Sequence, residues 1–292
     1  MEINQIFSDF TDSVGHVVIY ARAAKKLTNK ELEELEKQTE AHNKRLEEYP
    51  DWFSAFDRMY FQCPKSGETK LYFNSVDSLQ DRKDKVWLHR NKNYQWLLAE
   101  AYEAFEVFIA RLYAYIGKTE PSYWQMQDFG TAKLNEIEQK PFEWYYERAK
   151  KKKDFPKSIL NAFRDLCPEI DVYEKNNSSE VNMRLTLKLI EKFRHLIVHN
   201  GGVLGDLEEV HKKVVRECGF SDKSADSDIA MQYLKSLVMP IKGKFTIVLM
   251  EKDLNGYPNG VVSNTFENLV KRLVAYSSLL SEEVSSLVAR KV

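Results

Sequence analysis

The segment Glu191-Lys-Phe-Arg-His-Leu-Ile-Val-His-Asn-Gly-Gly202 is the part of the sequence from which fold and chemistry are best inferred. It carries Arg194, a histidine directly after it, His195, and a second histidine one helical turn further on, His199. The two closing glycines favour a left-handed residue just after a helix. The segment therefore predicts the last turns of a helix that begins near Ser178.

This helix is expected to be amphipathic. At about 100° per residue, one face collects the apolar side chains of Val181, Leu185, Leu189, Phe193, Leu196 and Ile197. The polar face collects Arg184, Lys188, Glu191, Lys192, His195 and His199. His195 and His199 are neighbours one turn apart, whereas Arg194 lies about 140° round the helix from His199. Arg194 and His199 can then meet only through the long reach of the arginine, or across two copies of the chain.

His199 should lie in the last turn of the helix, where the unpaired carbonyls carry partial negative charge. That position favours the protonated imidazolium form. The residues alone also allow a plainer interpretation, in which the histidines are solvated helix-end residues and Arg194 is surface charge.

The sequence Arg194-His-Leu-Ile-Val-His-Asn200 resembles the signature of the HEPN superfamily. That signature is an arginine, usually a polar residue directly after it, and a histidine about four to six positions on, near a helix end. The polar second position and the following Asn-Gly-Gly agree with prokaryotic defence-type members. The resemblance implies a mainly α, up-and-down helical bundle. It also implies a metal-independent endoribonuclease with a role in phage defence or in a toxin–antitoxin pair. A cytoplasmic location is expected separately, from the odd number of widely spaced cysteines and the lack of a signal peptide or membrane-spanning run.

The reaction implied by the resemblance is attack of the RNA's own 2′-hydroxyl on the phosphodiester, which gives a 2′,3′-cyclic phosphate without metal or cofactor. We assign His199 as general acid or base, because imidazole titrates near neutral pH. Arg194 is assigned to the developing phosphorane charge, which its planar fork matches. His195 is the candidate second proton-transfer group or phosphate contact, and Asn200 is expected to orient the scissile phosphate.

The resemblance also implies partners. The site is expected to form at the two-fold interface of a homodimer, where two copies pool their arginines and histidines. RNA is the expected substrate, and a nucleotidyltransferase-type antitoxin is a further candidate partner. The alternative is a non-catalytic HEPN-like module that binds RNA or protein.

Composition narrows the class of protein. The 292 residues are 43% hydrophobic and 30% charged, which is typical of a soluble globular chain. The net charge of −1 means that RNA must be held by a local patch. Three widely spaced cysteines predict neither a disulfide framework nor a zinc cluster. We find no apolar run of membrane-spanning length and no signal peptide, so we expect no membrane association.

Two domains are expected. Residues 1–77 are predicted as an N-terminal extension with two helices, the second at 30–48, and a β-hairpin near 58–74. Residues 78–292 are predicted as the helical bundle, with a strand near 244–250, a turn at 255–260 and a final helix. Further helices are expected at 93–117, 131–152, 157–166, 207–218, 227–238 and 265–289.

The helix at 93–117 has apolar residues on more than one side and should run through the centre of the bundle. It also carries a row of carboxylates, Glu100, Glu103 and Glu106. We expect Glu103 and Glu106 to support a basic group of the motif helix, because a carboxylate in such surroundings needs a partner. An exposed acidic stripe is the alternative.

A second candidate surface lies where the helix at 131–152 ends. Aromatic rings next to a run of lysines can stack on bases and neutralise phosphates of single-stranded RNA. The candidate RNA-binding residues are Tyr145, Tyr146, Lys150, Lys151, Lys152, Lys153 and, on the motif helix, Lys188. The alternative is a solvated lysine run that suits the negative end of a helix.

Overall fold

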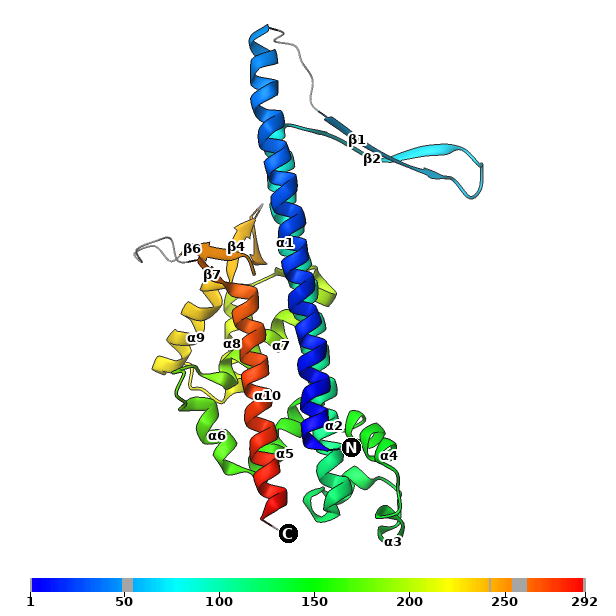
Figure 1. The fold of residues 1–292 in the computed structure, drawn as a ribbon, viewed down its shortest axis with the longest axis vertical. Helices are drawn as coiled ribbons and strands as arrows, with labels where there is room; N and C mark the ends of the chain where they lie inside the picture. Colours follow the sequence, from blue (N-terminus) through cyan, green and yellow to red (C-terminus); the bar gives the residue numbers. More distant parts are fainter. Residues whose placement is uncertain (1, 49–54, 242, 254–261, 291–292) are drawn as a thin grey trace. The chain divides into compact units, whose positions relative to one another are not determined.

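The computed structural model describes residues 2–48, 55–241, 243–253 and 262–290. The chain is mainly helical with small antiparallel sheets (Figure 1), as the sequence predicted. It divides into two compact units, the first formed by residues 1–19 and 94–292 and the second by residues 20–93. This division differs from the expected boundary between 77 and 78. The reason is that two long helices, α1 (Ile3–Glu48) and α2 (Leu79–Thr119), each contribute to both units.

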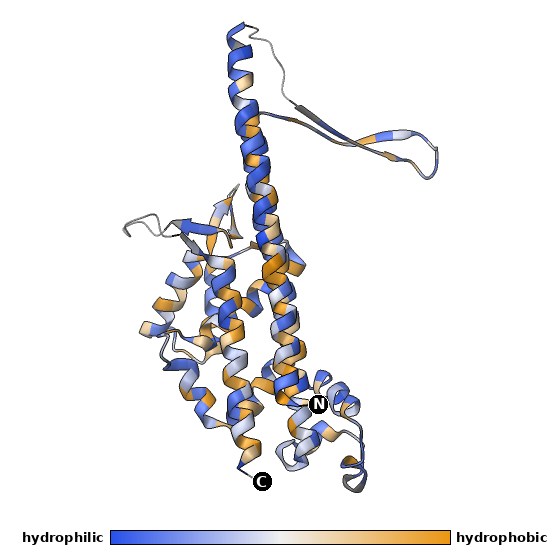
Figure 2. Cartoon of the chain, viewed as in Figure 1, coloured by the Kyte–Doolittle hydropathy of each residue, from blue (hydrophilic) through white to orange (hydrophobic). Residues whose placement is uncertain are grey.

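The α1 helix is one continuous element rather than the two helices predicted. It contains no proline, and Thr28 bonds back within the helix, its Oγ1 donating to the carbonyl of Ala24 at 3.0 Å. Nothing therefore interrupts the backbone ladder near residue 29. The later turns of α1 are largely hydrophilic (Figure 2), which fits the Glu- and Lys-rich sequence there.

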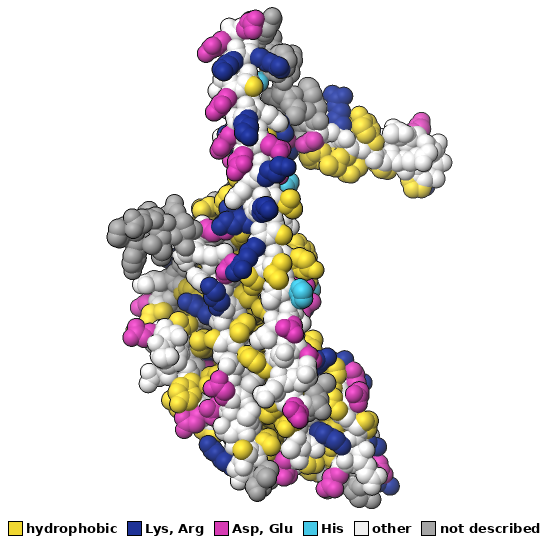
Figure 3. Space-filling model, in the orientation of Figure 1, with side chains coloured by type: hydrophobic (Ala, Val, Ile, Leu, Met, Phe, Trp, Pro, Cys, Tyr) yellow, Lys and Arg dark blue, Asp and Glu magenta, His cyan; other side chains and the backbone are white. Residues whose placement is uncertain are grey.

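The second unit pairs the later part of α1 with the early part of α2 in antiparallel fashion. Arg90 Nη1 donates to Asn29 Oδ1 at 2.8 Å, and Leu35 and Val86 are buried. The predicted hairpin is confirmed as β1 (Ala55–Gln62) and β2 (Thr69–Asp77). Its strands expose a set of hydrophobic side chains (Figure 3), namely Met59, Tyr60, Phe61, Leu71, Tyr72, Phe73 and Val76.

The first unit is built around α2, which is central as predicted. Its residues from Leu98 to Ile116 include nine-tenths-buried aromatic and aliphatic side chains on several sides. Phe105 lies 6.4 Å from Phe10 of α1 and 6.0 Å from Tyr276 of α10 (Thr265–Ala289), measured between ring centroids. The motif helix α7 (Met183–Asn200) completes this core.

Shorter elements surround this core. They are η1 (Pro121–Tyr123), η2 (Met126–Phe129), α3 (Leu134–Ile137), α4 (Phe142–Lys150), α5 (Lys157–Leu166), α6 (Pro168–Lys175), α8 (Leu207–Cys218) and α9 (Ala225–Ser236). The helices predicted at 157–166, 207–218 and 265–289 have the observed bounds. The single helix predicted at 131–152 is wrong, because this stretch holds the short helix α3, which ends at Ile137, and a separate helix α4, which starts after Pro141.

The sheets of this unit are small. One has the strand order β3 (Val203–Leu204), β5 (Lys244–Ile247), β4 (Val238–Ile241), and the other pairs β6 (Glu251–Asp253) with β7 (Val262–Asn264). The strand predicted near 244–250 is thus confirmed for its first half. The turn predicted at 255–260 lies outside the described residues.

Two glycines connect α7 to β3. Gly201 ends the helix with a φ of 62°, and Gly202 follows with a φ of 79°. A Cβ on Gly202 would lie 2.4 Å from Gln95 Oε1, and the Gln95 side chain donates to the carbonyl of Ile247 at 2.6 Å. The glycine pair therefore allows both the helix stop and the close approach of α2. In the described part of the chain, we find no helix with the length and apolarity needed to span a membrane.

Candidate functional site

The α7 helix positions the predicted catalytic residues. Asn182 caps its start, accepting a hydrogen bond from the Leu185 backbone at 2.9 Å, so the helix begins at Met183 and not near Ser178. Leu189, Phe193 and Ile197 are buried on the predicted apolar face. Burial of this stripe fixes the rotation of α7, and with it the direction of each polar side chain.

His195 and His199 form a histidine pair on the exposed side of α7. Their ring centroids are 4.6 Å apart, with 51° between the ring planes. The pKa of His195 is lowered, first because the ring is partly desolvated and then because His199 and Lys192 add positive charge nearby. His195 therefore favours the neutral form, in which one ring nitrogen can accept a proton.

Arg194 points to a different neighbour, the α2 helix. Its Nη2 donates to Glu103 Oε1 at 3.1 Å, which confirms the contact expected between this carboxylate row and the motif helix. Its Nε is buried without a hydrogen-bond partner among the described residues. The Arg194 side chain is 29% exposed and that of Glu103 is 55% exposed, so the pair reaches the surface.

Two further groups of α2 complete this Arg194 cluster. Burial raises the pKa of Glu106, with Arg194 opposing the shift and Glu103 adding to it. The Tyr102 hydroxyl is also buried, which together with the charge of Glu191 raises its pKa well above the usual value. The cluster thus places one arginine among several carboxylates, and both raised pKa values report a poorly hydrated environment.

The histidine pair and the Arg194 cluster occupy different sides of α7. Arg194 contacts Glu103 of α2, whereas His199 contacts His195 and lies exposed near the helix end. This arrangement follows from the angular offset predicted for the two residues. Asn200 is the last residue of α7 and is also exposed. Within one chain, Arg194 and His199 thus face different neighbours.

The aromatic and lysine surface predicted at the end of α4 is only partly exposed. Tyr145 is fully buried, and its hydroxyl donates to the carbonyl of Ile137 at 2.7 Å. The Lys152 side chain is 6% exposed and forms an ion pair with Asp128 at 2.5 Å. Neither residue can stack on or bind RNA from these positions, because the fold uses both in its core. The prediction for these two residues is wrong.

The remaining residues of that surface are accessible. Lys150, Lys151 and Lys153 are exposed, and the Lys150 ammonium lies 4.7 Å from the centroid of the half-buried Tyr146 ring. Lys150 is paired with Glu147 at 2.6 Å, which raises its pKa. Positive charge is therefore present there, but without the row of exposed aromatic rings that single-strand stacking requires.

The earlier turns of the polar face of α7 are partly covered, whereas its last turns, with His195 and His199, are exposed. The Lys188 side chain is only 4% exposed and pairs with Glu191 at 2.6 Å. Arg184 points inward to Glu174 of α6, whose side chain is fully buried. The reason is that α6 and α8 both pack on α7. Lys188 is consequently not available as the RNA contact predicted from its position.

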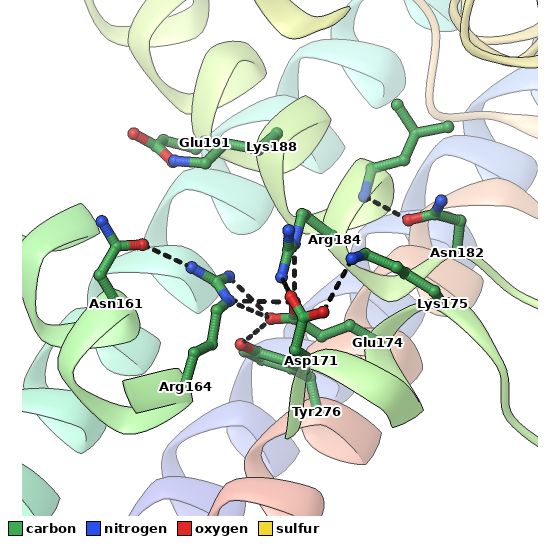
Figure 4. Close-up of polar contacts among 11 residues, drawn as sticks. Asn161, Arg164, Asp171, Glu174, Lys175, Asn182, Arg184, Lys188, Glu191 and Tyr276 are labelled. Carbon is green, nitrogen blue, oxygen red and sulfur yellow. Dashed lines mark hydrogen bonds and ion pairs between the residues drawn. The ribbon is translucent and has the colours of Figure 1, made fainter. Parts of the chain in front are cut away.

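The Glu174 cluster is a feature that the sequence did not indicate (Figure 4). Glu174 accepts from Arg164 Nη2 at 2.7 Å, Arg184 Nε at 2.7 Å and the Tyr276 hydroxyl at 2.5 Å. Asp171 is a second partner of Arg184. In sequence, Glu174 lies in a charged stretch that is typical of a surface helix, and its partners come from three other helices.

A cavity of about 720 Å³ lies beside this cluster, among α5, α6, α7 and α8. We call it the arginine pocket. It is lined by Lys157, Asn161, Arg164, Asp165, Pro168, Asp171, Val172, Arg184, Lys188, Arg216, Glu217, Cys218 and Gly219. Among the residues that the structure describes, no three His, Cys, Asp or Glu side chains are grouped to hold a metal ion.

Comparison with known proteins gives no relative for this chain, since no family model, curated protein or solved structure matches it.

Proposed function

We propose that this chain is a metal-independent endoribonuclease of the HEPN type. The observation that carries the proposal is the histidine pair, two exposed imidazoles on α7 whose ring centroids are 4.6 Å apart. General acid–base cleavage of RNA needs one group that accepts a proton and one that donates it. A neutral His195 with a lowered pKa suits the first role. His199, at the negative end of the helix, suits the second.

The proposal places the active centre at the two-fold interface of a homodimer. Arg194 is held toward α2 by Glu103, away from the histidine pair of its own chain. A second copy can bring its own arginine or histidines to the same phosphate, and Arg194 then stabilises the phosphorane charge. Asn200, beside His199, would orient the phosphate. RNA is the substrate, and a role in phage defence or alongside a nucleotidyltransferase-type antitoxin belongs to the same proposal.

A second candidate is a non-catalytic HEPN-like module that binds RNA or protein. One observation favours it, namely the ion pair between Arg194 and Glu103. An arginine whose charge is already balanced by a carboxylate attracts a phosphate less strongly. In this case the Arg194 cluster has a structural role, and the histidine pair contributes only to binding.

The test is RNA cleavage by the purified protein in excess chelator. We would compare the wild type with Arg194→Ala, His195→Ala and His199→Ala, and use His16→Ala as the matched control, because His16 is exposed and belongs to α1, not to the helix that carries the histidine pair. Products would be analysed for 2′,3′-cyclic phosphate ends. Loss of one general acid or base should lower the rate about 10²–10⁴-fold.

Three outcomes separate the proposals. Cleavage by the wild type and by His16→Ala, with loss in the other variants, supports the ribonuclease. Cleavage that survives Arg194→Ala and His199→Ala contradicts this active centre. RNA binding without cleavage favours the binding module. Sedimentation measured over the same concentrations tests the dimer, since a monomer that cleaves RNA would exclude a shared site.

A further inference from the structure

The arginine pocket is a second candidate binding site, and it involves neither the histidine pair nor Arg194. Its basic side chains are Lys157, Arg164, Arg184, Lys188 and Arg216, against the acidic Asp165, Asp171 and Glu217. Asp171 is already paired with Arg184 and Lys175, whose contacts lower its pKa. Asp165 and Glu217 form no ion pair within the described part of the chain, so the pocket presents both basic and acidic groups, and its arginines are the groups suited to an anion.

The Glu174 cluster holds two of these basic groups, Arg164 and Arg184, in place through hydrogen bonds (Figure 4). Arg164 gives its Nε and Nη2 to Glu174 and its Nη1 to Asn161. Arg184 gives its Nε and Nη2 to Glu174 and Asp171, which leaves its Nη1 for a ligand. Side chains held by buried contacts lose little conformational freedom when a ligand binds. The cluster is thus a preorganised support for the pocket.

Two other basic residues of the pocket are not engaged. Lys157 of α5 and Arg216 of α8 are exposed, and neither forms an ion pair with another described residue. Arg216 also lines an adjoining cavity with Lys212 and Lys213, where Glu209 pairs with Lys213 and Asp222 adds a further carboxylate. Unpaired arginine next to a preorganised one is the combination that recognises phosphate oxygens.

We propose that the arginine pocket binds the phosphate group of a nucleotide, either a free nucleotide or the phosphorylated end of an RNA. A volume of about 720 Å³ is far larger than a single phosphate ion needs and falls in the range of sites for small organic ligands. Pro168 and Val172 of α6 provide an apolar wall for a base or ribose, while Arg184 and Arg216 contact the phosphate. The site is independent of the ribonuclease proposal.

The experiment is calorimetric titration of the full-length protein. The probes are pyrophosphate, AMP, ATP and a short 2′-O-methyl oligonucleotide, which cannot be cleaved by 2′-hydroxyl attack, with and without a 5′-phosphate. The variants are Arg216→Ala and Lys157→Ala, since both side chains are exposed and unpaired and their loss should not disturb folding. Lys235→Ala, an exposed lysine of α9 outside the pocket, is the matched control.

We expect AMP, ATP or the 5′-phosphorylated oligonucleotide to bind, with affinity reduced about ten-fold by Arg216→Ala and unchanged by Lys235→Ala. Preference for ATP or AMP would identify a free nucleotide, and dependence on the 5′-phosphate would identify an RNA end. Absence of binding to every probe would overturn the proposal. So would affinities that neither Arg216→Ala nor Lys157→Ala changes, or pyrophosphate binding as tightly as ATP.

Discussion

The Glu174→Gln substitution is the most direct test of how the first unit is held together. Glu174 is fully buried and accepts hydrogen bonds from two arginines and a tyrosine. The amide of glutamine has nearly the same shape but carries no charge and replaces one acceptor oxygen by a donor. Arg164 contacts both carboxylate oxygens and would face the new donor in either orientation of the amide, and only the half-exposed Asp171 would be left as a negative partner of Arg184.

The expected loss is about 3–5 kcal/mol of unfolding free energy, the range for breaking a buried ion pair by removing one partner. Burial alone disfavours the charge on Arg164, yet the contacts with Glu174 and Tyr276 outweigh it and raise the pKa of that guanidinium. Tyr276→Phe removes a single hydrogen bond to the carboxylate and should cost about 1.5–3 kcal/mol. The charge therefore accounts for more of the stability than the tyrosine contact.

Urea unfolding followed by circular dichroism measures the unfolding free energy of both variants. The slope of that free energy against urea concentration shows whether the unfolded state is unaltered. Glu143→Gln is the control, because Glu143 is exposed at the start of α4 and should change stability by less than about 0.5 kcal/mol. If Glu174→Gln lowers the unfolding free energy by less than about 1 kcal/mol, with the urea dependence unchanged, the reasoning is refuted. Neutralising a buried carboxylate that is bonded to two arginines should cost more than that.

Four further predictions concern other parts of the chain. Gly202→Ala should cost about 2 kcal/mol in urea unfolding, because φ is 79° there and a Cβ would collide with a side chain of α2. The pKa of His195 is lower in the folded chain than in the unfolded chain, so the unfolded chain takes up a proton first as the pH falls. The free energy of unfolding should therefore decrease as the pH drops from about 6.5, the ordinary histidine pKa, and NMR titration of His195 should give a pKa below about 6.5. The pKa of Glu106 is higher in the folded chain than in the unfolded chain, so the free energy of unfolding decreases as the pH rises through the folded-state pKa and the buried carboxyl ionises. Glu106→Gln removes this ionisation and should raise the melting temperature near neutral pH. Alkylation mapped by mass spectrometry should modify Cys63 first, because hydrogen bonds from Ser66 lower its pKa, and Cys218 last, because burial raises its pKa to about 12.

The local elements of this protein were largely determined by the sequence. Apolar spacing of 3.6 residues predicted the motif helix, the central helix and the final helix, although the first two begin at Met183 and Leu79 rather than near 178 and 93. Strand and turn residues predicted a hairpin near 58–74, which the structure extends to 55–77. The glycine pair after Asn200 correctly predicted the end of α7. The angular offset between Arg194 and His199 was also readable from the sequence, because it depends only on helix geometry.

The tertiary structure alone decided which polar residues are exposed. Lys152 and Lys188 are residues that the sequence alone would place on a solvated surface. In the structure both side chains are buried, and they form ion pairs with Asp128 and Glu191. Glu174 became an anchor because α6 packs against α7 and α10, which brings residues far apart in sequence to one carboxylate. Helical periodicity gives the direction of a side chain from its own axis, but burial depends on what packs over it, and that is set only when the elements assemble.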